Sequence, residues 1–437
     1  MIRQNWQDLA IVTGVPAFQA MLHVGRPNVG DEGRLLARFR EILDRRWFTN
    51  DGPVVREFEA RIAELADVKH CVAMCNATVA LEIASRALGM AGEVVVPSLS
   101  FVATAHALQW QGITPLFADI TPGTHHIDPD SIERLLTPRT TGIVGVHLWG
   151  TACDIEALED IARRRRLRLM FDAAHAFGCT HRGRPIGGFG EAEVFSFHAT
   201  KFVNSFEGGA VVTNDDSLAE RMRLMRNFGF AGYDRVVHPG TNGKMSEVCA
   251  AMGLTSLESL DQIVSANRAN YHLYRELLGR IPGLRLYRYD ESERCNYQYV
   301  VFEVDPVEAG LTRDELIAVL VTENVNARRY FWPGIHRMEP YASYQPNASL
   351  LLEETEQVAA RLLSLPTGTA IGPDQIRTIA SIITTALASR EAVRGRLAAN
   401  LSPASVPAMV VDEEAEPFHP VHAYPATVGP SPGRLVR

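Results

Sequence analysis

Short apolar runs alternate with amphipathic segments through the first half of the chain, and this alternation constrains the fold more than any other feature. Helical periodicity separates the runs, for example over Thr78–Leu88 and Ser131–Leu136. Alternating strands and helices favour a mostly parallel sheet covered by helices, which is an α/β fold. The expected strands are Cys71–Met74, Glu93–Val96, Pro115–Ala118, Thr141–Val146, Leu167–Phe171, Ala192–Phe197 and Gly209–Thr213.

The second half of the chain predicts a smaller unit. The run Asn214–Asp216 caps a helix that begins near Ser217, and a long helical region is expected over Ser246–Leu278. Beyond it lie a strand-like run, Tyr297–Val304, and a helical run, Arg313–Thr322. After about Glu391 a last helix gives way to a proline-rich tail, which is either disordered or extended across a partner subunit.

The sequence thus divides into four parts. These are an N-terminal segment (1–35), a large cofactor-binding domain (36–255), a small C-terminal α/β domain (256–390) and the tail (391–437).

Composition narrows the function classes. The chain has 437 residues, 46% of them apolar, and a formal net charge of −8. We therefore expect no membrane-spanning segment and no export signal, and the charge balance does not favour binding to nucleic acid. The run Arg163–Arg166 is expected to end a helix in solvent. The six cysteines lack the spacing of a zinc site, so we expect reduced packing residues, no metal, and a cytoplasmic enzyme.

Two residues stand out as candidates for chemistry. Lys201 ends the run Phe195–Lys201, and an ammonium among aromatic residues either lies at the surface or is held there for a reaction. Desolvation lowers the pKa of such a lysine and frees its amine as a nucleophile. Asp172 ends the preceding strand, where an open α/β sheet places its ligand crevice.

A carboxylate and an amine on successive strands suit pyridoxal 5′-phosphate, whose ring nitrogen needs an anion and whose aldehyde needs an amine. The same residues also have a structural interpretation. Asp172 can cap a turn or a helix, and Lys201 can be a solvated surface charge.

From about Phe58 to Leu260 the sequence resembles the sugar aminotransferases of the DegT/DnrJ/StrS group. Six segments occur in the family's order and at its spacing: Val68–Ala73, Pro97–Thr104, Asp172–His175, Ser196–Lys201, Glu207–Gly209 and Gly240–Glu247. The resemblance implies dimeric enzymes of the aspartate aminotransferase fold, fold type I, that carry pyridoxal phosphate.

The resemblance also assigns roles to individual residues. Lys201 matches the Schiff-base lysine and Asp172 the partner of the pyridine nitrogen. Phe101 matches the aromatic residue that stacks on the cofactor ring. The cofactor phosphate is expected to meet the backbone of Ala77 and Thr78 at a helix start. The remaining cofactor residues implied by the resemblance are Ser196 and His198 at the phosphate, His175 at the ring oxygen, and Asn242, which reaches across the dimer interface.

Departures from the family pattern point to one subgroup. The usual Ser-Gly-Thr of the phosphate site is Asn76-Ala77-Thr78, and the usual Gln beside the cofactor hydroxyl is His175. His175, together with His198–Thr200, Thr241–Met245 and Arg328–Gly334, makes the sequence resemble one subgroup, whose members aminate C4 of dTDP-4-keto-6-deoxyglucose. For the nucleotide-sugar substrate, the candidate ligands are Lys244, Arg328, Arg329 and Tyr330.

The sequence therefore predicts transfer of an amino group from glutamate to the C4 ketone of a nucleotide-linked sugar. Alternatives are a C3-ketosugar or cyclitol aminotransferase, a cofactor-dependent dehydratase, and a non-catalytic regulator. Related dehydratases replace the lysine with histidine, so Lys201 argues against the dehydratase. A binding module has no need for a Schiff-base amine.

Overall fold

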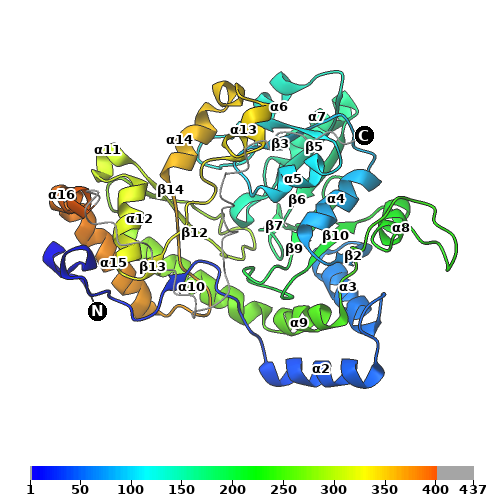
Figure 1. Cartoon of the computed structure of the whole chain (residues 1–437), viewed down its shortest axis with the longest axis horizontal. Helices are drawn as coiled ribbons and strands as arrows, with labels where there is room; N and C mark the ends of the chain where they lie inside the picture. Colours follow the sequence, from blue (N-terminus) through cyan, green and yellow to red (C-terminus); the bar gives the residue numbers. More distant parts are fainter. Residues whose placement is uncertain (1, 401–437) are drawn as a thin grey trace, which may run out of the picture.

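A seven-stranded sheet forms the centre of the computed structural model, which describes residues 2–400 (Figure 1). The strand order is β2-β10-β9-β6-β5-β3-β4, and β10 alone runs antiparallel to its neighbours. The strands are apolar throughout because both faces of the sheet are covered by helices. Their bounds are β2 His70–Met74, β3 Glu93–Pro97, β4 Thr114–Ala118, β5 Thr140–Val146, β6 Arg168–Asp172, β9 Ala192–Ser196 and β10 Gly209–Thr213.

Two apolar cores lie on the two faces of this sheet. One contains Phe58, Leu158 and Leu254, which come from helices α3, α7 and α9. The other contains residues of α4, α5 and α8, such as Met222. The helix bounds are α3 Pro53–Ala66, α4 Ala77–Ala87, α5 Ala103–Gln109, α6 Pro129–Leu135, α7 Ile155–Arg165, α8 Asp216–Met225 and α9 Glu247–Glu258.

A smaller unit follows, built on a three-stranded antiparallel sheet in the order β11-β12-β14. Helices α10, α12 and α15 pack on it around a separate apolar core. Its elements are α10 Leu260–Leu278, β11 Leu284–Leu286, β12 Val300–Val304, α11 Pro306–Ala309, α12 Arg313–Thr322, β13 Val325–Asn326, α13 Tyr341–Tyr344, α14 Glu353–Arg361, β14 Leu362–Leu365, α15 Pro373–Ala388 and α16 Arg390–Asn400.

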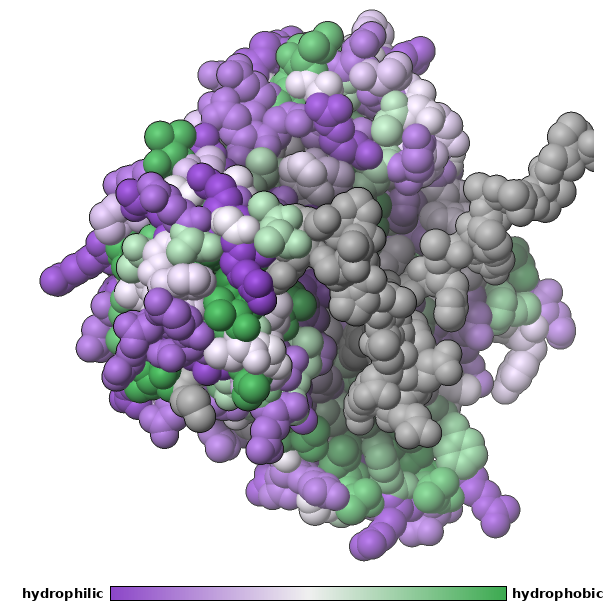
Figure 2. Space-filling view, turned by 60° about the vertical axis from the view of Figure 1, so that its left-hand side comes forward, coloured by the Kyte–Doolittle hydropathy of each residue, from purple (hydrophilic) through white to green (hydrophobic). Residues whose placement is uncertain are grey.

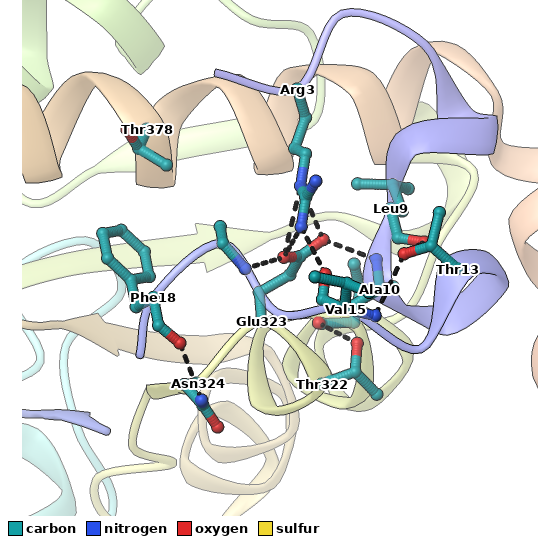
Figure 3. A network of polar contacts seen from close by, with 12 residues as sticks. Arg3, Leu9, Ala10, Thr13, Val15, Phe18, Thr322, Glu323, Asn324 and Thr378 are labelled. Atoms are coloured by element: carbon teal, nitrogen blue, oxygen red, sulfur yellow. Dashed lines mark hydrogen bonds and ion pairs between the residues drawn. The ribbon is translucent and has the colours of Figure 1, made fainter. Parts of the chain in front are cut away.

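The N-terminal segment packs on this smaller unit before the chain enters the large one. Strand β1 (Leu22–His23) pairs in parallel with β13. Buried Glu323 accepts hydrogen bonds from the Arg3 guanidinium and from the backbone N–H of Ala10 and Ala17 (Figure 3). The remaining early helices are α1 Ala10–Thr13 and α2 Glu32–Arg45, and a short hairpin joins β7 Thr180–His181 to β8 Arg184–Pro185.

The structure confirms the mostly parallel α/β fold, and the seven expected strands begin and end within one residue of their predicted bounds. The helix at Arg313–Thr322 is also as predicted, and Asp215 caps α8. The run of arginines does end a helix, since α7 stops at Arg165 with exposed side chains.

Three expectations about the second half were wrong. The helical region over Ser246–Leu278 is two helices, because Ser259 leaves helical geometry between α9 and α10. Strand β12 begins at Val300 rather than at Tyr297, whose φ of 50° is incompatible with extended backbone. The tail does not begin near residue 391, since α16 continues to Asn400; positions 401–437 lie outside the described residues. The other domain boundaries stay predictions.

No helix within residues 2–400 is both long enough and apolar enough to cross a bilayer.

Candidate active site

The candidate site lies where the parallel strands of the large sheet end. Asp172 is the last residue of β6, and Ser196 is the last residue of the neighbouring strand β9. The loop after β9 carries Lys201, so the fold brings the two predicted catalytic residues to one edge of the sheet. This edge is the usual position of a ligand crevice in open α/β sheets.

Lys201 lies in a turn, because its backbone N–H donates to the carbonyl oxygen of His198 at 2.8 Å. Its Nζ donates to the hydroxyl of Tyr299 at 3.2 Å. Burial lowers the pKa of Lys201 to about 8, and the nearby Asp172 carboxylate opposes this shift. The neutral, nucleophilic amine is therefore far more abundant near neutral pH than in an ordinary solvated lysine.

Asp172 is buried and held by two hydrogen bonds. Its Oδ2 accepts from the Thr104 hydroxyl at 2.8 Å, and its Oδ1 accepts from the backbone N–H of Ala174 at 3.1 Å. Burial raises the pKa of this carboxyl, while these hydrogen bonds and the Lys201 charge act in the opposite direction. The two bonds fix the orientation of the carboxylate that a pyridinium would meet.

An aromatic wall surrounds His175. Its ring lies 4.4 Å from that of Tyr299 and stacks on Trp149 and Phe331 at 6.0 and 5.9 Å between centroids. Burial holds the pKa of His175 well below its ordinary value, so the ring is neutral. Because its Nδ1 accepts from the Trp149 backbone N–H at 3.3 Å, we assign the ring proton to Nε2.

The N-terminus of α4 lies beside these strand ends. Asn76 caps the helix by accepting from Val79 N–H at 2.9 Å, so Ala77 and Thr78 are its first two residues. A Cβ at Gly209, the first residue of β10, would come within 2.6 Å of Ala77 Cα. Strand β10 pairs Gly209 with Ser196, so the helix start and the Ser196 hydroxyl lie at neighbouring strand ends.

His198 is oriented by its own loop. Its Nδ1 lies 2.9 Å from the Thr200 hydroxyl, and its Nε2 lies 3.6 Å from a carboxylate oxygen of Glu207. Phe101, just before α5, is 58% exposed and lies 6.3 Å from the Phe331 ring.

These groups fit pyridoxal phosphate by the chemistry of their donors. A phosphate suits the α4 N-terminus with Ser196, a pyridinium suits Asp172, and an aldehyde suits the amine of Lys201. Within residues 2–400, no group of three or more His, Cys, Asp or Glu is placed to hold a metal ion.

The predicted substrate ligands do not all gather at this site within one chain. Tyr330 lies 6.3 Å from the Tyr299 ring, and the Arg328 guanidinium lies 5.4 Å from the Tyr330 ring. Arg329 instead pairs with Asp314 at 3.4 Å.

Lys244 and Asn242 lie beside the end of β2, where the Cys75 N–H donates to the Gly243 carbonyl oxygen at 2.9 Å. Lys244 donates to Asn227 Oδ1 at 3.0 Å and forms a bridge with Met74 of β2, the outer strand of the sheet. Asn242 is exposed and bridges Asn227. Their roles at a cofactor or substrate remain predictions.

Sequence reasoning did not single out Thr104, Tyr299 or Trp149. Thr104 had a signal, since it closes the family-like segment Pro97–Thr104. Tyr299 and Trp149 had none: Tyr299 reaches the site from the small unit, and Trp149 lies in the turn Leu148–Gly150 after β5.

The fold and the site together define a pyridoxal phosphate-dependent aminotransferase of fold type I. The chain belongs to the DegT/DnrJ/EryC1/StrS aminotransferase family, whose model matches residues 31–384.

Individual relatives agree with this assignment. The chain is 36% identical to a dTDP-4-amino-4,6-dideoxy-D-glucose transaminase of Shigella dysenteriae, over 83% of this chain and 98% of the relative. It is 36% identical to a GDP-perosamine synthase of Caulobacter vibrioides, over 69% and 82%. Among solved structures, DesI in the presence of its TDP-sugar product is 50% identical, with a TM-score of 0.86 over 90% of this chain and 99% of DesI.

Proposed function

We propose that this enzyme aminates the C4 ketone of a dTDP-linked 4-keto-6-deoxy sugar in the cytoplasm, with glutamate as the amino donor. The observation that carries the substrate assignment is the 50% identity to DesI, which was solved with its TDP-sugar product. The Shigella dysenteriae relative is named for the corresponding 4-amino sugar.

The residues of the site support this chemistry. Bound pyridoxal phosphate supplies an electron sink and carries the amino group between the two substrates. The Lys201 amine would hold the cofactor and, when free, move a proton at the reacting carbon. The Asp172 carboxylate, fixed by Thr104, would keep the ring nitrogen protonated. Neutral His175 would offer its Nε2–H to the ring oxygen, and the aromatic wall would exclude water.

The rival functions lack such support. A regulator that only binds cofactor does not need the amine of Lys201 or a carboxylate positioned by Thr104. A C3-ketosugar or cyclitol substrate would use the same cofactor residues, so product analysis must separate it from the C4 ketosugar.

We also propose a homodimer with shared active sites. A set of large apolar side chains is exposed on and around α2, at the lower edge of the molecule in Figure 1, and Figure 2 shows apolar residues gathered at that height. Exposed apolar surface of this extent marks an interface. Its members include Leu36, Leu43, Trp47, Phe48, Phe206 and Val248.

The test is product analysis with defined ketosugars. The glutamate-loaded enzyme is mixed with dTDP-4-keto-6-deoxyglucose, a 3-keto isomer, a GDP-linked 4-ketosugar and a free cyclitol ketone. Mass spectrometry and NMR then identify the aminated product. Amination at C4 of the dTDP sugar is expected. Amination of the cyclitol alone would overturn the nucleotide-sugar assignment and leave the aminotransferase intact.

A further inference from the structure

Two arginines and a histidine from two segments distant in sequence lie near the site. Strand β1 pairs His23 with Asn326 of β13, and the His23 Nδ1 lies 3.2 Å from the Asn326 amide nitrogen. Arg328 follows two residues after Asn326. Burial lowers the pKa of His23, and the charges of Arg26 and Arg328 lower it further. Because β1 and β13 run in parallel, Arg26 and Arg328 both follow the same end of this two-stranded sheet.

In this cation cluster (Arg26 and Arg328, with the imidazole of His23 beside them), no carboxylate of the described residues neutralises the two arginines. All three side chains are exposed. Arg329 next door pairs with Asp314, whereas in the described part of the chain neither Arg26 nor Arg328 forms an ion pair. Gathering like charges costs free energy, so an unneutralised cluster is suited to an anion.

Two aromatic side chains, Tyr330 and Tyr299, lie between this cluster and the amine of Lys201. The Arg328 guanidinium packs over Tyr330, Tyr330 contacts Tyr299, and the Tyr299 hydroxyl accepts from Lys201 Nζ. On the other side, Gly25 has a φ of 75°, and a Cβ there would lie 3.1 Å from Thr200, the residue before Lys201. The N-terminal segment thus runs directly against the lysine loop.

Asn28 fixes this segment in place. Its buried side chain donates to the Phe202 carbonyl at 3.0 Å and accepts from the Thr369 hydroxyl. The Asn204 amide donates to the Asn28 carbonyl at 2.8 Å. One asparagine thereby ties the segment to both the lysine loop and the small unit, so the cation cluster is preorganised relative to Lys201.

We infer that the cation cluster binds the diphosphate of the nucleotide-sugar substrate, with Arg26 and Arg328 as the principal ligands. This inference rests on the proposed function. It adds His23 and Arg26 of the N-terminal segment to the substrate site, and it assigns no diphosphate contact to Arg329, whose charge Asp314 already meets. Arginine suits this role because its planar fork can donate two hydrogen bonds to a phosphate.

The test measures binding of dTDP and of thymidine to the holoenzyme by calorimetry. Arg26→Gln and Arg328→Gln should each weaken dTDP binding by roughly tenfold, because each removes a charge-assisted contact. Thymidine binding should be unchanged, since thymidine has no phosphate. Arg377→Gln is the matched control; Arg377 is an exposed arginine on α15 paired with Asp374 and should bind dTDP like the wild type.

Raised ionic strength should weaken dTDP binding in the wild type more than in the Arg26→Gln/Arg328→Gln double variant. If both single variants bind dTDP as the wild type does, or if thymidine binding falls equally, the inference is wrong. The proposed function fails in a different experiment, in which the wild type yields no aminated nucleotide sugar. A wild type that aminates the sugar while the variants keep full dTDP affinity would overturn the diphosphate site alone.

Discussion

Lys201 is one of only three lysines in the chain, and its surroundings differ from those of the other two. Lys69 is exposed and lies 3.6 Å from Asp216. Lys244 packs its ammonium over the Phe228 ring at 4.7 Å. Of the three, Lys201 alone combines a position at the sheet edge, a hydroxyl partner and a nearby buried carboxylate. The scarcity of lysine makes its chemical role easy to test.

Lys201→Ala should abolish covalent attachment of the cofactor, because Lys201 is the only one of the three lysines that lies near Asp172 in the described residues. The measurement is borohydride reduction of the holoenzyme, followed by proteolysis and mass spectrometry of the three lysine-containing peptides. Lys69→Ala is the control and should keep the adduct on Lys201. A reduced adduct on Lys69 or Lys244 in the wild type would contradict the assignment.

The amine of Lys201 should titrate near pH 8 in the cofactor-free enzyme. Burial depresses its pKa from the ordinary value, so the reactive neutral amine accumulates as pH rises through about 8. The readout is the rate at which trinitrobenzenesulfonate labels the Lys201 peptide between pH 6 and about 10.

Asp172→Asn should move the midpoint of this labelling curve to lower pH, because the carboxylate of Asp172 raises the pKa of Lys201. In the unfolded chain the midpoint should return to about 10.4. A folded enzyme with that same midpoint would show that Lys201 is not desolvated.

At the scale of elements, one buried carboxylate joins the N-terminal segment to α12. Glu323 follows that helix and is fully buried, and it accepts from Arg3 Nη2 at 2.7 Å and from Ala10 and Ala17 N–H at 2.7 Å (Figure 3). A buried arginine that loses its carboxylate partner lowers the free energy of unfolding. The order of the segment that bears His23 and Arg26 therefore depends on Glu323.

Glu323→Gln should destabilise the enzyme by about 3 kcal/mol, because it leaves the Arg3 charge buried and uncompensated. Urea unfolding measures the loss, and limited proteolysis should find new cuts before residue 22. The matched control is Glu291→Gln, which breaks the exposed pair with Arg275 and should cost less than about 1 kcal/mol. Equal losses in the two variants would contradict a special role for Glu323.

The elements that sequence predicts best are those whose signal is local. The strand runs are short, apolar and bounded by polar residues, so their bounds agree with the structure. Tyr297 has a strand-like neighbourhood, yet a positive φ keeps it out of β12. The helical pattern over Ser246–Leu278 hides the break at Ser259, because one residue outside helical geometry leaves little trace in periodicity.

The residues of the candidate site likewise include some that a local sequence pattern marks and some that only tertiary packing brings there. Asp172 is visible in sequence because it ends an apolar strand, and Lys201 because it follows an apolar strand within five residues. Tyr299 lies 98 residues from Lys201, and its hydrogen bond to that lysine depends on tertiary packing. The pairing of His23 with Asn326 likewise joins residues 303 positions apart. No local pattern marks such contacts.

At the scale of the whole molecule, the active site faces a boundary between units, and the large unit carries an apolar face that nothing in the described chain covers. Asn242 and Lys244 lie on the outer side of β2, next to Asn227 and the exposed ring of Phe228. A second subunit packed on this apolar face would bring its own cofactor within reach of Asn242.

Mixing two inactive variants tests whether the sites are shared. Lys201→Ala lacks the catalytic amine, and Asn242→Ala lacks the residue proposed to act on the partner's cofactor. In a heterodimer, one site would combine the intact Lys201 of one chain with the intact Asn242 of the other. Because about half of randomly mixed dimers are heterodimers with one such site, activity should recover to roughly a quarter of the wild-type level.

Asn242→Ala assayed alone must be inactive for this recovery to be meaningful, and native mass spectrometry must detect the heterodimer. Phe48→Asp provides a second measurement, since a charge placed on the exposed apolar face should disfavour association and lower activity as the enzyme is diluted. Heterodimers that form yet stay inactive would mean that each site is built within one chain, and Asn242 would then act where the structure places it, beside Asn227 at the edge of its own sheet.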